Sequence, residues 1–242
     1  MPSDDYMDRD ERDDIMDMDD ELDLVDEADG QDRDAGQEAD GDDGDTVTFA
    51  SLGLPEEILE AVTDMGFRVP TPIQAAAIPP LLELREVVGI AQTGTGKTAA
   101  FGLPLLAIVD ADERDVQALV LAPTRELAMQ SAQAIEDFAA RTARLDVVPV
   151  YGGSPYGPQI GALKRGAQVV VGTPGRVIDL IEKGALDLSN VRMLVLDEAD
   201  EMLRMGFAED VETIASSVPD DRLTALFSAT MPATSRRWRA ST

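Results

Sequence analysis

The stretch VVGIAQTGTGKT, residues 87–98, decides the fold. Its first four residues are apolar or small and mostly β-branched, which is typical of a buried strand. Gly94 and Gly96 come next, and Lys97 and Thr98 open a segment with helical spacing. A glycine-rich turn between a strand and a helix lets backbone N–H groups surround a phosphate chain at the helix N-terminus. The stretch therefore predicts a phosphate-binding loop.

The residue types of this loop suit Mg-ATP. Lys97 can reach the β- and γ-phosphate oxygens, and the Thr98 hydroxyl can bind Mg²⁺. The backbone around the phosphates comes from Thr93, Gly94, Thr95 and Gly96. The general pattern begins with glycine, whereas Ala91 stands at that position here. Taken alone, the loop could also be a glycine-rich turn with a solvated lysine.

Apolar runs and amphipathic segments alternate on both sides of the loop. The expected strands are Val87 to Ala91, Val116 to Ala122, Val147 to Tyr151, Gln168 to Gly172, Met193 to Leu196 and Leu223 to Phe227. The first expected helix has Pro55 in its first turn and ends just before Gly66, and the others are Thr98 to Val109, Arg125 to Ala140, Arg176 to Lys183 and Phe207 to Ser216. This alternation predicts an α/β fold, doubly wound, with a mostly parallel sheet and helices on both faces. Ligands of such sheets bind at the carboxyl ends of the strands.

Two carboxylates follow one of these strands at the position that a nucleotide site requires. Asp197 can hold Mg²⁺ that bridges the β- and γ-phosphates, because this ion prefers hard oxygen ligands. Glu198 can orient and deprotonate the water that attacks the γ-phosphorus. A helix N-terminus also attracts acidic residues, but that preference does not explain their position directly after an apolar strand.

Composition excludes several kinds of chemistry. The 242 residues contain no cysteine and no histidine, so disulfides, zinc fingers, thiol nucleophiles and Ser-His-Asp triads are excluded. The net charge of −28 argues against a nucleic-acid partner, but residues 1–45 hold 22 acidic and only 3 basic side chains. Most of the acidity therefore belongs to an N-terminal tail, and the remaining chain can still approach RNA.

We expect residues 1–45 to be a disordered acidic tail, because so charged a segment cannot repay the entropy of ordering. Its charge should repel RNA from the neighbouring domain, most strongly at low salt. Alternatively, its few apolar residues form a short docking segment for an unknown protein partner. No signal peptide and no membrane-spanning run stand out, so we expect a cytoplasmic protein without a membrane partner.

With AQTGTGKT and DEAD in place, the chain resembles the N-terminal RecA-like domain of bacterial DEAD-box ATP-dependent RNA helicases. The further motifs occur in the family's order: Phe49 upstream of Gly66-Phe67, PTPIQ (70–74), PTRELA (123–128), Gly152-Gly153, TPGR (173–176), DEAD (197–200) and SAT (228–230). The resemblance covers residues 47 to 232. It implies a RecA-like P-loop NTPase lobe over 46–232, with ATP and Mg²⁺ as its cofactors and RNA as its partner.

The resemblance also implies a role for each matching residue. Gln74 would pair with adenine and Phe49 would pack on the base. Asp200, Ser228 and Thr230 would couple hydrolysis to movement of the domains. Contacts with the RNA backbone, which carry no base specificity, would come from Thr124, Arg125, Gly153, Thr173, Gly175 and Arg176.

Each of these short motifs also has a plain structural interpretation. PTPIQ and TPGR could simply start helices, because each places proline in a first turn. Gly152-Gly153 could be an ordinary turn, and SAT could end a strand.

The sequence departs from the family at two places. Leu84 stands where the family commonly has glycine before the first strand, which makes that turn suspect. Residues 233–242 do not continue the family pattern, which would run through a linker into a second RecA-like domain that supplies arginine fingers and an HRxGR-type motif. We expect these residues to be a non-family C-terminal tail.

Two functions of different classes fit these observations. The first is an RNA-dependent ATPase and helicase, of which this chain is the ATP-binding lobe. The second is a single lobe that binds ATP and RNA without turnover, which we expect to describe the behaviour of these 242 residues alone. A related helicase acting on DNA is opposed by the PTPIQ motif and the intact DEAD and SAT motifs.

Overall fold

The computed structural model describes residues 23–25, 47–142 and 144–230. Most of the expected acidic tail and all of the expected C-terminal tail, 233–242, lie outside these ranges. Within the described ranges, no helix is both long and apolar enough to cross a bilayer.

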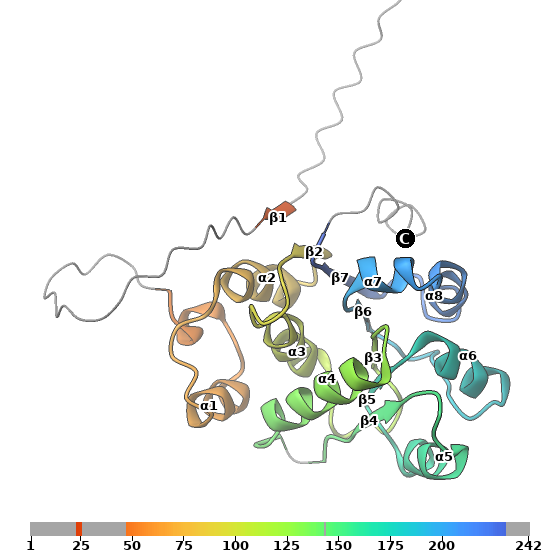
Figure 1. The fold of residues 1–242 in the computed structure, drawn as a ribbon. Helices are drawn as coiled ribbons and strands as arrows, with labels where there is room; N and C mark the ends of the chain where they lie inside the picture. The colour runs from red at the N-terminus through yellow and green to blue at the C-terminus, as the bar shows by residue number, and fades with distance from the viewer. Residues whose placement is uncertain (1–22, 26–46, 143, 231–242) are drawn as a thin grey trace, which may run out of the picture.

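The centre of the fold is one parallel sheet (Figure 1). Its strand order is β1-β2-β7-β6-β3-β5-β4, and every neighbouring pair runs parallel. The strands are β1 (Asp23–Val25), β2 (Val87–Ile90), β3 (Ala118–Leu121), β4 (Val147–Val150), β5 (Val169–Gly172), β6 (Met193–Leu196) and β7 (Leu223–Ser228). The predicted fold class is confirmed. All six predicted strands are present, and β1 adds a short edge strand from within segment 1–45.

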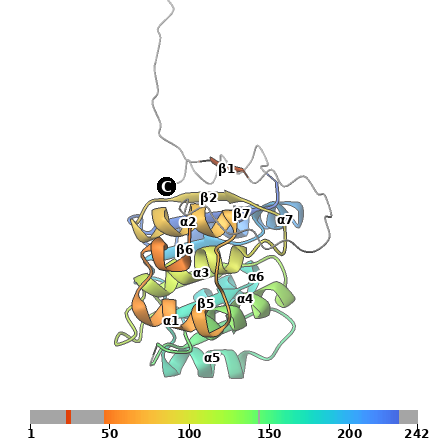
Figure 2. The same ribbon diagram turned by 90° about the vertical axis from the view of Figure 1, so that its left-hand side faces the viewer.

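Helices cover both faces of the sheet (Figures 1 and 2). One face carries a short 3₁₀ helix η1 (Phe49–Leu52), α1 (Glu56–Asp64), α2 (Pro72–Leu82), α3 (Lys97–Ile108) and α4 (Arg125–Phe138). The other face carries α5 (Tyr156–Arg165), α6 (Pro174–Glu182), α7 (Ala199–Arg204) and α8 (Ala208–Ala215). Of these helices, η1, α5 and α7 are not among the predicted ones, and α2 corresponds to the helix start that is the plain interpretation of PTPIQ.

The strands read as continuous apolar runs because both of their faces are buried. Alternate residues of β3 and β6 belong to different cores: Val120 and Val195 pack under the first helix layer, whereas Leu119 and Leu194 pack under the second. All four side chains are essentially inaccessible to solvent. The two cores fix the sheet between the helix layers, and its carboxyl edge remains available for ligands.

The predicted motifs divide this edge into two halves. The phosphate loop and DEAD follow β2 and β6, and SAT begins at the last residue of β7, which lies between these two strands. The three segments with expected RNA contacts, PTRELA, TPGR and Gly152-Gly153, follow β3, β5 and β4, which are also neighbours. Strand order therefore brings the nucleotide motifs together on one half and the RNA motifs together on the other.

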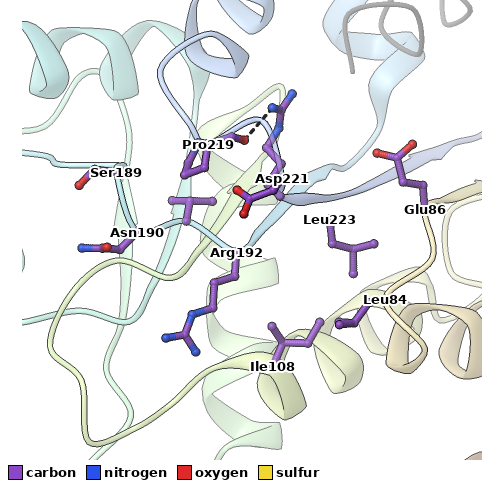
Figure 3. Close-up of a pocket in the computed structure, with 11 residues that line it drawn as sticks. Leu84, Glu86, Ile108, Ser189, Asn190, Arg192, Pro219, Asp221 and Leu223 are labelled. Atoms are coloured by element: carbon purple, nitrogen blue, oxygen red, sulfur yellow. Dashed lines mark hydrogen bonds between the residues drawn. The ribbon is translucent and has the colours of Figure 1, made fainter.

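The opposite, amino-terminal edge carries a cavity of about 410 Å³ (Figure 3). Leu84, Ile108 and Leu223 form part of its lining, and polar side chains such as Asn190 and Arg192 surround them. None of the predicted nucleotide or RNA residues lines this cavity. The cavity is therefore separate from the edge that carries the motifs.

The suspect turn before β2 is strained. Leu84 has a φ of 59°, in the left-handed region that glycine adopts without cost, and its side chain is 66% exposed. A non-glycine residue in this conformation loses about 1–2 kcal/mol. The departure from the family pattern at this position thus has a physical consequence.

We expect Leu84→Gly to stabilise the chain by about 0.5–1 kcal/mol. Relief of the left-handed strain exceeds the added chain entropy of glycine, and the mostly exposed leucine gives up few contacts. Leu84→Ala is the matched control, because it removes the same side chain but keeps the Cβ that causes the strain. Thermal melting should place the glycine variant above wild type and the alanine variant at or below it. A glycine variant that melts with the alanine variant would contradict the strain.

Candidate nucleotide and RNA sites

The phosphate loop has the backbone conformation that its sequence predicts. Gly94 and Gly96 have φ values of 85° and 89°, and Gly96 caps α3 directly before Lys97. A Cβ at Gly96 would lie 2.3 Å from Nε2 of Gln74, so a side chain at this position would displace the Gln74 amide. Thr95 Oγ1 donates to the Gln92 carbonyl at 2.7 Å, which closes the turn. The loop thus places α3 with its N-terminus, and its partial positive charge, at the edge of the sheet.

A buried ion pair joins the phosphate loop to the DEAD segment. Lys97 Nζ donates to Glu198 Oε1 at 2.7 Å, and both residues are buried. The two lie 101 positions apart in the chain, and the sheet brings them together because β7 alone separates β2 from β6. Two predicted catalytic residues are therefore in direct contact.

Glu198 reaches Lys97 from a sharp turn. Its φ is 51°, a left-handed conformation that costs a non-glycine residue about 1–2 kcal/mol. The turn lets the chain leave β6 and enter α7 within two residues, 197 and 198. Strain of this kind persists only where the surrounding structure holds it, and it is concentrated at functional sites.

Asp197 is buried beside this pair. Burial raises its pKa to about 6, and the positive charge of Lys97 offsets part of that effect. Its Oδ2 accepts a long hydrogen bond of 3.4 Å from Ser131, while its buried Oδ1 has no hydrogen-bond partner among the described residues.

The residues present fit Mg²⁺ as this ion is usually bound. The free carboxylate oxygen of Asp197 is a hard ligand, and Mg²⁺ commonly takes one or two carboxylates together with substrate phosphates and water. Over the described part of the chain, no cluster of three or more acidic side chains forms a cage for a metal by itself. The donor set therefore suits an ion that arrives with phosphates.

The third acidic residue, Asp200, is bound to the SAT segment. Thr230 Oγ1 donates to Asp200 Oδ2 at 2.8 Å, and the Asp200 N–H donates to Ser228 Oγ at 3.3 Å. Burial alone would raise the pKa of Asp200, but these hydroxyls and nearby backbone N–H groups hold it below its ordinary value. The predicted coupling residues are thus brought together, although their role in coupling stays a prediction.

Gln74 links the helix start to the phosphate loop. Its Oε1 accepts from the Thr71 N–H at 2.9 Å, as in a helix-capping box, and its Nε2 donates to the Gly96 carbonyl at 3.2 Å. PTPIQ therefore does start a helix, as its plain interpretation held, and the same glutamine also contacts the nucleotide loop. Its amide is buried and engaged, and adenine recognition by it stays a prediction.

The predicted adenine-packing residue Phe49 lies in the core. Its ring is 3% exposed and meets Phe67 edge-on at 5.8 Å, and Phe67 in turn meets Phe138 at 6.1 Å. A ring covered in this way offers little surface to a base. The structure gives Phe49 a packing role, and its role toward adenine stays a prediction.

The predicted RNA residues lie on the other half of the edge. Thr124 and Thr173 are the N-caps of α4 and α6, and Arg125 lies over the Tyr151 ring at 4.8 Å. Gly153 and Gly175 are exposed, and a Cβ at either would meet no atom within 4 Å. Arg176 differs from the others because it is 7% exposed and bonded to protein groups.

Sequence reasoning missed two buried polar residues. Ser131 donates to Asp197 from the middle of α4, and Gln159 bonds to both Tyr151 and Arg176 from α5. Neither belongs to a recognisable motif in one sequence. A glutamine or serine on an amphipathic helix cannot be recognised as a site residue from local sequence, because its partners lie in distant segments.

The fold and this edge define a class of protein: a RecA-like P-loop NTPase lobe. A model of the family described as DEAD/DEAH box helicase matches residues 71–238. The chain belongs to this family, as its resemblance implied.

Several curated relatives share this lobe. The chain is 58% identical to a protein of Haemophilus influenzae and 56% identical to one of Mycobacterium tuberculosis, both named ATP-dependent RNA helicase DeaD. Each alignment covers 80% of this chain but only 32% and 34% of those proteins, so the chain spans about a third of their length. The crystal structure of a DEAD box protein from Methanococcus jannaschii, 45% identical, matches with a TM-score of 0.76 over 80% of this chain and 53% of that one.

The raised pKa of Asp197 predicts how the stability of the metal-free chain depends on pH. The pKa is about 6 in the folded chain against an ordinary 3.8, so the folded chain binds this proton more tightly. The contribution of Asp197 to the free energy of unfolding should therefore fall as pH rises from about 4 to about 6, by on the order of 2–3 kcal/mol.

Asp197→Asn should remove this contribution, because an amide does not ionise. Urea unfolding in EDTA at pH 4.5 and pH 7 should show a smaller loss of stability for the variant than for wild type. The other carboxylates are common to both chains, so the difference reports Asp197 together with its electrostatic coupling to Lys97 and Glu198. Equal changes with pH in the two chains would contradict the raised pKa.

Proposed function

We propose that this chain is the ATP-binding lobe of an ATP-dependent RNA helicase. The observation that carries the proposal is the buried contact of Lys97 with Glu198, next to Asp197, at the end of a phosphate loop. Family membership and relatives named as RNA helicases support it. Within this proposal, residues 46–232 form the lobe, while 1–45 and 233–242 flank it. Because RNA and ATP occur in the cytoplasm, we place the activity there.

Lys97 and Glu198 would exchange partners when ATP binds. Charge-assisted bonds from a lysine to phosphate oxygens compete directly with its bond to a carboxylate. Once Lys97 turns to the β- and γ-phosphates, Glu198 Oε1 is free to accept a proton from the attacking water. The ion pair therefore holds the base inactive until a triphosphate is present.

Asp197 and Thr98 would hold Mg²⁺ on the phosphates. The ion, when bound, neutralises the charge that develops on the phosphate oxygens during transfer. One oxygen of Asp197 accepts from Ser131, and the other, which has no hydrogen-bond partner among the described residues, would be the ligand of the ion. Metal binding also favours the ionised carboxylate, which burial alone disfavours.

RNA would bind on the half of the edge formed after β3, β5 and β4. Helix starts at Thr124 and Thr173, the exposed Arg125 and the glycine turn at Gly153 offer N–H groups and a cation to phosphates. Contacts of this kind read the backbone and carry no base sequence. The Thr230 bond to Asp200 would connect hydrolysis to domain movement.

A second candidate function is ATP and RNA binding without turnover by these 242 residues. Lys97 supplies positive charge to one side of the γ-phosphate, and in the resembled family arginine fingers from a second lobe supply the other side. Such fingers are worth about 10³–10⁵ in rate. A lobe alone also has no opposing surface against which to bend an RNA strand.

Nucleotide binding should depend on Lys97. We expect Lys97→Met to weaken Mg-ATP binding by about tenfold to a hundredfold, since a charge-assisted bond contributes about 1.5–3 kcal/mol. Combining Lys97→Met with Glu198→Gln avoids leaving a buried carboxylate unpaired, and Lys164→Met removes an exposed cation as the control. Calorimetric titration measures the affinities. Equal ATP affinity of the double variant and wild type would refute the loop assignment.

Nucleotide selection should depend on Gln74. We expect Gln74→Ala to lose the preference for ATP over GTP that wild type shows in the same titration. A variant that keeps the full preference would show that this glutamine only caps α2 and supports Gly96.

Turnover separates the two candidate functions. We expect the purified 242-residue chain to bind Mg-ATP, to hydrolyse it barely above background and to show no stimulation by RNA. A coupled phosphate-release assay with and without RNA measures this, with Glu198→Gln as the matched control for contaminating ATPases. RNA-stimulated turnover that Glu198→Gln abolishes would contradict the single-lobe behaviour.

A further inference from the structure

Gln159 is a buried glutamine outside every predicted motif, and it joins two of the segments expected to hold RNA. It is 6% exposed and is the buried residue of α5. Its Oε1 accepts from the Tyr151 N–H at 3.3 Å and from Arg176 Nη1 at 3.0 Å, while its Nε2 donates to the Tyr151 carbonyl at 3.2 Å. The amide orientation is fixed, because a guanidinium only donates and a carbonyl only accepts.

The Gln159 amide gives the residue after β4 the two backbone hydrogen bonds that a neighbouring strand would otherwise provide. Val150 is the last residue of β4, and Tyr151 follows it with both of its backbone polar groups bonded to the glutamine. Backbone groups that leave a sheet need such partners. The exposed Gly152 and Gly153 come next, so their starting position is set by this one side chain.

Arg176 fixes the other end of the glycine turn. Its Nη2 donates to the Ser154 carbonyl at 3.0 Å, and its guanidinium stacks on the Tyr156 ring at 4.2 Å. Tyr156 is held in turn by a 2.8 Å hydrogen bond to Asp179. Because Arg176 also donates to Gln159, the two supports of the turn are bonded to each other.

This arrangement gives Arg176 a different place from the one its motif implies. A side chain that is 7% exposed, with Nη1 and Nη2 bonded to protein oxygens, presents little surface to an RNA phosphate. Arg125, which is exposed, lies over the ring of Tyr151, the same residue whose backbone Gln159 holds. All three expected RNA segments therefore meet at the Tyr151–Gln159–Arg176 contacts.

We propose that Gln159 is a positioning residue for RNA binding, which holds the turn 151–154 in its binding conformation through Tyr151 and Arg176 without touching RNA itself. The inference rests on the proposed function, because it assumes that this half of the edge binds RNA. Glycines contribute binding groups only through their backbone, so their contribution depends on how well neighbouring groups fix that backbone. Gly153 lies within this turn and has a left-handed φ of 72°.

The test compares Gln159→Met with Gln159→Glu in the 242-residue chain. Methionine keeps the length of the side chain and removes its hydrogen bonds. Glutamate keeps both acceptor roles, loses the donation to the Tyr151 carbonyl and adds a negative charge beside Arg176. Gln133→Met, at an exposed position on α4, is the control. Fluorescence anisotropy with a labelled oligouridine at low salt gives RNA affinity, titration gives Mg-ATP affinity, and hydrogen exchange reports residues 151–154.

We expect Gln159→Met to weaken RNA binding about fivefold to tenfold and Gln159→Glu to weaken it less. Mg-ATP affinity should stay within twofold of wild type, and faster hydrogen exchange should be confined to the turn and the start of α5. RNA affinity equal to wild type in both variants would overturn the inference. A parallel fall in RNA affinity, ATP affinity and melting temperature in both variants would overturn it too, because that result marks a purely structural role.

The RNA affinity of the wild-type chain distinguishes failure of this inference from failure of the proposed function. If the wild-type chain binds no oligouridine at low salt, RNA binding by this lobe is wrong and the positioning role falls with it. If wild type binds and Gln159→Met binds equally well, the proposed function stands and only the inference fails.

Discussion

The buried ion pair between Lys97 and Glu198 is the constraint on which the active edge depends. Two charges removed from water lose several kcal/mol of hydration each, and only a close partner compensates that loss. Both partners lie at sharp turns of the backbone: Lys97 directly follows the left-handed Gly96, and Glu198 has a left-handed φ itself. The pair thus joins the starts of α3 and α7, and in the proposed function a triphosphate replaces Glu198 as the partner of Lys97.

The parallel sheet makes this pair possible and also separates the two expected ligands. Because β7 lies between β2 and β6, the ends of these three strands form one continuous nucleotide edge, and β3, β5 and β4 continue it toward RNA. No side chain has to reach across the sheet. The order of the strands therefore places the nucleotide motifs beside the RNA motifs without a long connecting loop.

Much of the fold and of the nucleotide site was predictable from the sequence. The features that could not be predicted were missed for physical reasons. The six apolar strands, Lys97 and the DEAD carboxylates follow from local patterns, because each signal lies within a dozen residues. The helix α2 was harder to predict, since Pro79 and Pro80 normally end a helix but lie inside this one. Gln159 could not be found at all, because its importance comes from Tyr151 and Arg176, which only the fold places beside it. Contacts between distant segments leave no trace in local composition.

The helix α4 shows how the two halves of the edge are joined. It begins at Thr124 and Arg125 on the RNA half, and its residue Ser131 donates to Asp197 on the nucleotide half. Ser131 lies about two helical turns beyond Thr124, at about 3.6 residues per turn. The bond is long, 3.4 Å, and Asp197 has a second, unpartnered oxygen. The carboxylate expected to hold the metal therefore accepts a hydrogen bond from the same helix whose start is expected to contact RNA.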